Sequence, residues 1–378
     1  MKITFLINTL SEGKGIPNRV ASMAVALDKK GDTVSIVTFD RANRSLPDSI
    51  RVLEPKLFGK MRLPYRFLEM KSGLFNALAR TSIMACLKRL APEVVVVDFV
   101  PVDRYAMECR KKLGYKVVYT YHGIADPEMY TGEDRRKRIE TRDAMHAQVR
   151  RADYVMAVSR HTARELESLG IQSVVVPNGV DMDFFRPGKK LPAIQKKGPV
   201  LMYIGRYTPH KGVMNLLQAF AVVNKEVPDA VLYMFARHEH REYVSQLKQF
   251  IADNGLSGSV MMFRDIYGEI VPYLYGGADI FVSGALDETF GMTFVEAAAC
   301  GTPSAAFASK SIPEVVDDGK TGILCEPGDS AALARGIIKL LKDRKLLDEY
   351  SRNAVEFARK YNWDSIADQM RGILRGKA

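Results

Sequence analysis

The chain has 378 residues, of which 47% are hydrophobic and 26% charged, and this composition excludes the disordered, collagen-like and disulfide-scaffold classes of protein. Its four cysteines form no C-x-x-C pair, so no zinc motif is indicated, and a cytoplasmic protein is the expectation. The net charge of +11 is uneven, because residues 1–186 hold 31 Lys and Arg against 22 Asp and Glu.

Short apolar runs alternate with helical patterns in the first half of the chain, which favours parallel sheets covered by helices. These runs lie at Ile3–Ile7, Val34–Thr38, Val94–Asp98, Val117–Thr120, Val155–Val158 and Val174–Val176. The first run continues into polar residues, so we expect a strand there rather than a signal peptide. A helix is predicted at Asn18–Lys30, from apolar residues at three- and four-residue spacing. All the runs are far shorter than the ~18 residues that span a bilayer.

Proline, glycine and lysine interrupt this pattern over residues 187–199, which we interpret as a linker. The pattern resumes with runs at Val200–Ile204, Val231–Phe235, Val260–Phe263, Ile280–Val282, Ser304–Phe307 and Ile323–Cys325. We therefore predict an α/β fold of two Rossmann-like, doubly wound parallel-sheet domains, residues 1–186 and 200–360, which face each other across a cleft. Residues 361–378 are predicted to form a C-terminal helix that packs back on the N-terminal domain.

Two cations lie five residues apart after the strand predicted at Val200–Ile204. Arg206 and Lys211 follow Gly205 and precede a helix expected near Val213. A guanidinium, an ammonium and a helix N-terminus together suit the oxygens of a diphosphate. A basic loop that faces solvent is the alternative interpretation.

Two glutamates lie eight residues apart in the segment that follows the strand at Ile280–Val282. Glu288 precedes Phe290-Gly291, and Glu296 lies about one turn into a predicted helix. The first helical residues, Gly291 to Thr293 with Met292 between them, present N–H groups without an acceptor inside the helix. A carboxylate in the helix can accept hydrogen bonds from two ribose hydroxyls, and a carboxylate before the glycine can bind a sugar.

These motifs resemble the signature of the family-4 retaining glycosyltransferases of GT-B fold (glycosyl transferases group 1). Further stretches fit in order: Tyr121-His122-Gly123, Ala157-Val158-Ser159, Val176-Pro177-Asn178-Gly179-Val180-Asp181 and Ile312-Pro313-Glu314-Val315-Val316. The resemblance implies metal-independent transfer of a sugar from a nucleoside-diphosphate sugar, with retention of anomeric configuration.

The resemblance also implies roles for single residues. Arg206 and Lys211 would hold the diphosphate, and Glu296 the donor ribose. Glu288 and the amides of Gly291, Met292 and Thr293 would engage the sugar and the distal phosphate. His122 would reach the donor sugar near the reacting carbon. The donor-binding residues would also include Phe290 and Gly15, which would let the first loop approach donor and acceptor.

No cofactor or metal ion is expected, because the protein's own cations meet the charge of the leaving diphosphate. Asp181-Met182-Asp183 matches the Asp-x-Asp pattern of metal-dependent transferases, but it closes a loop at the linker. His238-Glu239-His240 lacks a third ligand at sensible spacing. The alternatives are a related phosphorylase or epimerase, and a non-catalytic module that binds a nucleotide sugar or a membrane surface.

The segment Arg41–Arg89 contains eleven basic and three acidic residues. The simple interpretation is that this segment forms a solvated basic face. The more specific interpretation is that it binds an anionic acceptor or an anionic membrane surface. Residues 62–68 interleave cations with aromatic and aliphatic side chains, which suits a membrane interface and a peripheral protein. The chain carries no signature of nucleic-acid binding.

Overall fold

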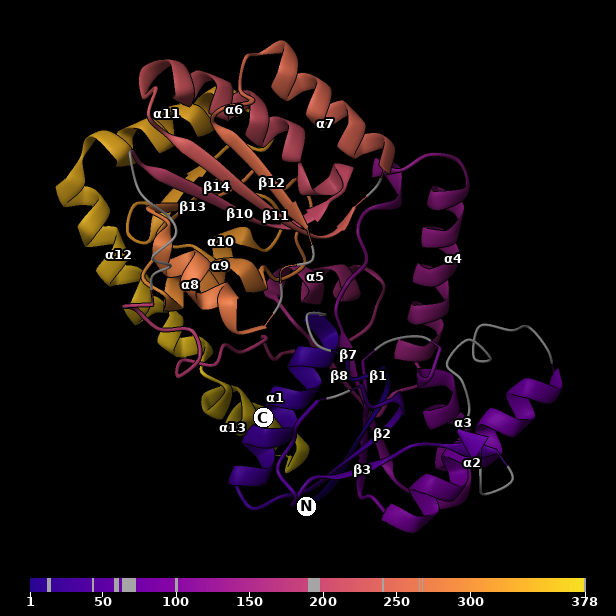
Figure 1. The fold of residues 1–378 in the computed structure, drawn as a ribbon. Coiled ribbons are helices and arrows are strands. Elements are labelled where there is room, and N and C mark those ends of the chain that lie inside the picture. Colours follow the sequence, from indigo (N-terminus) through magenta and orange to yellow (C-terminus); the bar gives the residue numbers. More distant parts are fainter. Residues whose placement is uncertain are drawn as a thin grey trace. The chain divides into compact units, whose positions relative to one another are not determined.

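The computed structural model describes residues 1–376 except 12–14, 43, 58–60, 63–72, 99–100, 190–197, 240, 265 and 267. It divides into two compact units (Figure 1). Unit 1 comprises Met1–Ile124, Glu133–Gly179 and Trp363–Ala378, and unit 2 comprises Ala125–Gly132 and Val180–Asn362. The division after Gly179 lies seven residues before the limit that we predicted at residue 186. Most of the predicted linker, residues 187–199, lies outside the described residues.

Unit 1 is built on a seven-stranded parallel sheet in the order β3-β2-β1-β6-β7-β8-β9. Its strands are β1 (Lys2–Thr9), β2 (Thr33–Asp40), β3 (Arg51–Leu53), β6 (Val94–Val97), β7 (Lys116–Tyr121), β8 (Tyr154–Ala157) and β9 (Val174–Val175). A separate antiparallel pair joins β4 (Lys56–Leu57) to β5 (Met61–Arg62). The four valines of β6 are all buried, as expected for a strand covered on both faces.

Helices cover both faces of this sheet (Figure 1). They are α1 (Gly15–Lys29), α2 (Gly73–Leu90), α3 (Asp103–Leu113), α4 (Gly132–Val149), α5 (Arg160–Ser168) and α13 (Trp363–Leu374). Helices α1 and α13 share one apolar core with β1 and β6, in which Phe5, Val20 and Ile366 are fully buried. The C-terminal helix thus belongs to unit 1, and a Cβ added at Gly179 would lie only 2.4 Å from the ring of Trp363.

Unit 2 is built on a six-stranded parallel sheet in the order β12-β11-β10-β13-β14-β15. Its strands are β10 (Val200–Tyr207), β11 (Val231–Glu239), β12 (Val260–Arg264), β13 (Ile280–Ser283), β14 (Ser304–Phe307) and β15 (Gly322–Cys325). Its helices are α6 (Val213–Glu226), α7 (Arg241–Asp253), α8 (Val271–Gly277), α9 (Met292–Ala299), α10 (Ile312–Val315), α11 (Ser330–Lys342) and α12 (Arg344–Ala358). Short 3-10 turns are η2 (Pro127–Met129), η3 (Pro209–Lys211), η4 (Gly268–Ile270) and η5 (Arg359–Tyr361).

Both sheets reverse their winding direction beside the first strand of the unit. The reversal falls between β1 and β6 in unit 1, and between β10 and β13 in unit 2. Ligands of doubly wound sheets bind outside the carboxyl ends of the strands at such a switch point. The segments that follow these four strands are therefore where functional side chains are expected. No helix among the described residues is both long and apolar enough to cross a bilayer.

Candidate active site

The switch point of unit 2 brings the two predicted motifs together. The segment after β10 carries Arg206 and Lys211, and the segment after β13 carries Glu288. The two backbones touch, since a Cβ added at Gly212 would lie 1.6 Å from the carbonyl oxygen of Gly284. Gly212 also has a φ of 52°, which favours glycine. This close contact holds the motifs side by side.

Arg206 lies at an irregularity in the sheet. Strand β10 continues three residues beyond its predicted end at Ile204, and its register against β11 shifts between Gly205 and Tyr207. Such a bulge re-aims the side chains next to it. The Tyr203 hydroxyl donates to the Arg206 carbonyl at 2.9 Å, and a Cβ added at Gly205 would collide with that hydroxyl. The Tyr203 hydroxyl therefore fixes the backbone that carries Arg206.

Lys211 forms an ion pair with Glu288. Its Nζ donates to Glu288 Oε2 at 2.8 Å and to the carbonyl oxygen of Asp287 at 3.2 Å. Burial favours the neutral acid, but the charge of Lys211 and its hydrogen bond, together with Arg206, outweigh that effect. The pKa of Glu288 therefore lies below its ordinary value. The site thus holds an ionised carboxylate beside two cations.

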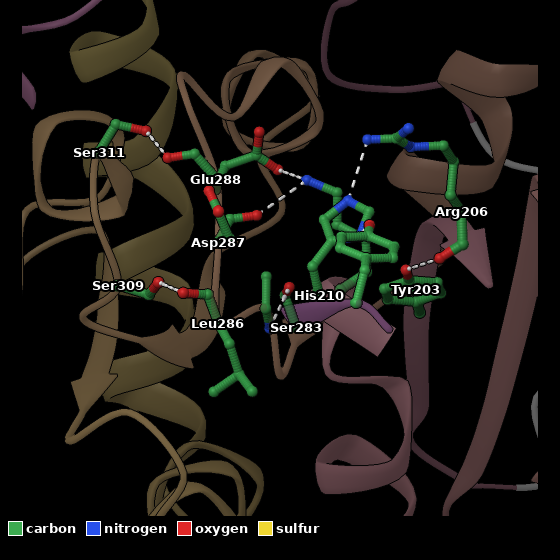
Figure 2. A network of polar contacts seen from close by, with 12 residues as sticks. Tyr203, Arg206, His210, Ser283, Leu286, Asp287, Glu288, Ser309 and Ser311 are labelled. Atoms are coloured by element: carbon green, nitrogen blue, oxygen red, sulfur yellow. Dashed lines mark hydrogen bonds and ion pairs between the residues drawn. The ribbon is translucent and has the colours of Figure 1, made fainter. Parts of the chain in front are cut away.

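The side chain of Arg206 contacts a buried histidine. Arg206 Nη2 lies 3.0 Å from Nε2 of His210, which Figure 2 shows turned toward the guanidinium. The other ring nitrogen, Nδ1, hydrogen-bonds with the hydroxyl of Tyr130. Tyr130 lies in the segment Ala125–Gly132, which belongs to unit 2. His210 lies between Arg206 and Lys211 in the sequence, but neither His210 nor Tyr130 was predicted as a site residue.

Glu296 lies in the second turn of α9 and is almost fully buried. Its Oε2 accepts a hydrogen bond from the Tyr275 hydroxyl at 3.0 Å. Gly291, with a φ of 97°, is the N-cap of α9, so Met292 and Thr293 form the first turn. Phe290 is buried and packs edge-on against Tyr361. Its side chain therefore anchors the segment to unit 2.

His122 follows β7 in unit 1 and is part of a buried charged cluster. Its Nε2 lies 3.0 Å from Asp98 Oδ1, and Arg19 Nη1 donates to the same oxygen at 2.7 Å. Burial would raise the pKa of Asp98, but the charge of Arg19 and the hydrogen bond from His122 bring it below its ordinary value. Burial lowers the pKa of His122, despite the opposing effect of Asp98. Neutral His122 thus carries its proton on Nε2, and Nδ1 is the acceptor nitrogen.

Asp98 and Arg19 were not identified as site residues from the sequence. The available signal was the position of Asp98, a carboxylate that directly follows four valines of a buried strand. Gly15, the other predicted site residue of unit 1, begins α1, and a Cβ added there would meet no described atom within 4 Å. Within the described residues, the position of that Cβ is therefore open.

Of the two motifs considered for metal binding, only Asp181-Met182-Asp183 has side chains that the structure describes. Asp181 Oδ1 accepts from the backbone N–H groups of Asp183 and Phe184 at 3.0 Å, so this carboxylate closes a turn. The side chains of His238, Glu239 and His240 lie outside the part of the chain that is described. No group of three or more His, Cys, Asp or Glu side chains in the described ranges is placed to hold a metal ion.

Known protein families match both halves of the chain. The model of "Glycosyltransferase Family 4" matches residues 13–184, and the model of "Glycosyl transferases group 1" matches residues 188–374. The chain therefore belongs to the glycosyltransferases that these two models describe. Its two parallel-sheet units are those of the GT-B fold.

Curated relatives match about half of the chain. A phosphatidyl-myo-inositol mannosyltransferase of Mycobacterium leprae is 31% identical over 215 residues, which are 54% of this chain and 54% of the relative. A D-inositol 3-phosphate glycosyltransferase of Geodermatophilus obscurus is 32% identical over 238 residues, 59% of this chain and 52% of that relative. The chain thus spans about half the length of the curated relatives it matches.

Solved structures match the fold over the whole chain. Sucrose-phosphate synthase from Thermosynechococcus elongatus aligns with a TM-score of 0.83 at 21% identity, and covers 100% of this chain and 99% of its own. The protein Alr3699/HepE of Anabaena, in complex with UDP and glucose, aligns with a TM-score of 0.76 at 20% identity over 99% of both chains. At these identities the likeness concerns the fold alone.

Proposed function

We propose that this chain is a retaining glycosyltransferase that transfers a sugar from a nucleoside-diphosphate sugar to an acceptor. One observation carries the proposal: Arg206 and Lys211 follow β10 at the switch point of a doubly wound sheet, and Lys211 pairs with Glu288, which shortly precedes the N-cap of α9. Breaking the bond between the sugar and the diphosphate builds negative charge on the leaving group. Fixed cations stabilise that charge as it forms, without reorganisation.

In this proposal, different residues of unit 2 bind different parts of the donor. Arg206 and Lys211 bind the diphosphate, and Glu296 accepts hydrogen bonds from the ribose hydroxyls. Glu288 and the first-turn amides of α9 bind the sugar and the distal phosphate. The ion pair between Lys211 and Glu288 supports this assignment, because it already places a cation beside a carboxylate that can accept from sugar hydroxyls.

In unit 1, His122 contacts the donor sugar near the reacting carbon. The tautomer set by Asp98 makes Nδ1 an acceptor, so His122 receives a hydrogen bond from a sugar hydroxyl rather than donating one. We propose that transfer needs no metal ion, since protein cations meet the charge of the diphosphate.

The donor site is tested by Arg206→Ala and Lys211→Ala. Each should lower the rate of sugar transfer by about 10²–10³, because each removes one charge aimed at the developing anion. The matched control is Lys225→Ala, which removes an exposed cation from α6. Release of nucleoside diphosphate from a panel of UDP-, GDP- and ADP-sugars is the measurement, with thermal unfolding as the check on the fold. Near-normal rates in both variants would contradict the proposed role of Arg206 and Lys211 in binding the diphosphate.

We further propose that the acceptor is lipid-linked or anionic. The basic excess of residues 41–89 supports this, and two relatives are named for inositol-containing acceptors, one of them a lipid. Each Lys or Arg near an anionic leaflet contributes about 1 kcal/mol, so a few cations suffice for reversible peripheral attachment. Of these cations, Lys60, Arg66 and Lys71 lie outside the described residues, as does the side chain of Arg62.

Co-sedimentation with vesicles tests this acceptor class. Binding should require anionic lipid, fall with added salt, and weaken in the triple variant Lys60→Gln, Arg62→Gln and Arg66→Gln. A triple variant of exposed cations in unit 2, Lys225→Gln, Lys339→Gln and Lys342→Gln, is the control. Equal recovery of the protein with neutral and anionic vesicles, or no recovery with either, would contradict membrane binding and favour a soluble acceptor.

A further inference from the structure

We propose that His210 and Tyr130 are positioning residues, which hold the Arg206 guanidinium in the orientation that binds the donor diphosphate. This inference rests on the proposed function, because it assigns the means by which one of the two diphosphate-binding cations is held. Neither residue contacts the donor in the proposal. They act through Arg206.

The tautomer of His210 follows from its two partners. A guanidinium has only N–H donors, so the 3.0 Å contact between Arg206 Nη2 and His210 Nε2 requires a lone pair on Nε2. The proton of the neutral ring must then lie on Nδ1, where the ring donates to the oxygen of Tyr130. A ring protonated on both nitrogens would set one N–H against another and one cation against another.

The histidine is itself held firmly. Its side chain is buried, and its carbonyl oxygen accepts from the backbone N–H groups of Leu286 and Asp287 at 3.0 and 3.1 Å. Asp287 in turn accepts, through Oδ2, from the backbone N–H of Asp126 at 2.6 Å. The segment that carries Asp126 and Tyr130 is thus bound to Asp287, which also binds the backbone of His210. A ring anchored on both sides can fix a long side chain that contacts it.

Arg206 and Lys211, the two cations proposed to bind the diphosphate, are held by different means. Lys211 is paired with the carboxylate of Glu288, which offsets part of its charge. Among the described residues, no carboxylate oxygen lies within ion-pair distance of the Arg206 guanidinium, whose side-chain partner is a neutral ring nitrogen. A neutral acceptor fixes the geometry of the guanidinium without pairing it directly with a carboxylate. Holding one long side chain in its bound rotamer raises affinity by cutting the entropy lost on binding.

Calorimetric titration of the full chain with UDP, GDP and ADP tests the assignment without an acceptor or turnover. His210→Leu removes both ring nitrogens, and His210→Asn keeps a polar atom only near the Nδ1 position. For the nucleotide that the wild type binds, each should raise the dissociation constant roughly two- to tenfold, the effect of freeing one long side chain. His210→Gln places an amide oxygen near the Nε2 position and should restore most of the lost affinity. Tyr130→Phe should weaken binding in the same direction.

A double-mutant cycle separates positioning of Arg206 from a merely structural role. In the Arg206→Ala background, His210→Leu should cause no further loss, because the side chain that it positions is already gone. The matched control is His146→Leu, which breaks a histidine–tyrosine pair in unit 1 and should not change affinity. Tyr130→Phe keeps the aromatic ring, so it serves as the readout if His210→Leu fails to fold.

The outcomes distinguish this inference from the proposed function. Wild-type affinity in His210→Leu, or equal losses with and without Arg206, would overturn the positioning role while the donor site stands. Absence of binding of all three nucleotides to the wild type would overturn the donor site and the positioning role together.

Discussion

Two ion pairs at the switch points differ in what surrounds them. Arg19 and Asp98 are both buried, with side chains about 1% exposed, whereas Lys211 and Glu288 keep 14% and 18% of their surface. Burial of a charge is costly unless it is paired, so Arg19 depends on Asp98 far more than Lys211 depends on Glu288. In a partly exposed ion pair, each charged side chain can exchange its partner for a ligand.

Asp98→Asn should strongly destabilise the protein. It leaves the buried guanidinium of Arg19 without a counter-charge, and losses of about 3–5 kcal/mol are typical of such broken pairs. Unfolding in urea gives the free energy. Glu226→Gln breaks the exposed pair with Lys342 and should cost at most about 1 kcal/mol. Equal costs for the two substitutions would contradict the buried pair.

Glu296→Gln should weaken binding of the donor nucleotide. A charged acceptor for two hydroxyls becomes a neutral amide, and charge-assisted hydrogen bonds contribute about 1.5–3 kcal/mol, so tens-fold is expected. Calorimetric titration with the donor measures the change. The control is Glu314→Gln in α10, a glutamate with no role in the proposed site. An unchanged dissociation constant for Glu296→Gln would exclude the ribose role.

At the scale of elements, the buried strands were predictable, and so were the edge strands β9, β12 and β15, whereas the edge strand β3 was not. The all-valine β6 is recognisable because a strand covered on both faces must be apolar throughout. The short edge strand β3 is half-buried and polar at its start, so the sequence carried no signal for it. The end of β10 was placed too early, because the register shift at Arg206 depends on pairing with β11.

The site was predictable where its residues are near one another in sequence. Arg206 with Lys211, and Glu288 with Glu296, form local motifs whose spacing can be read directly. The partners of these residues come from distant segments: Arg19 and Asp98 are 79 residues apart, and Tyr130 and His210 are 80 apart. Such pairs follow from the fold and leave no local pattern.

The contact between Gly179 and α13 should be sensitive to one methyl group. Gly179→Ala places a Cβ against the ring of Trp363, and overpacking of this kind typically costs about 1–3 kcal/mol. Gly372→Ala lies on α13 in open space and should stabilise the helix by roughly 0.5–1 kcal/mol. Trp363 is the single tryptophan of the chain, so its fluorescence during urea unfolding reports on unit 1. The same sign of change in both variants would contradict the packing described.

At the scale of the whole molecule, transfer should continue in excess EDTA. In the proposed mechanism Arg206 and Lys211 supply the charge that a metal ion would otherwise supply, so the rate should stay within about twofold of the untreated enzyme. Product formation before and after chelation is the measurement. Complete loss that magnesium or manganese restores would contradict this mechanism and make Asp181 and Asp183 candidates for ligands.

The order of segments along the chain has a consequence for biosynthesis. Unit 1 is assembled from three stretches, and the third, which starts at Trp363, follows the main body of unit 2 in the sequence. Domains fold as units while the ribosome delivers the chain from its N-terminus. The sheet of unit 1 is therefore translated early but stays uncovered over the face that α13 occupies, until residues 180–362 have been translated. The nascent chain therefore carries an open apolar surface while residues 180–362 are translated, and this is the interval in which a chaperone would have to protect it.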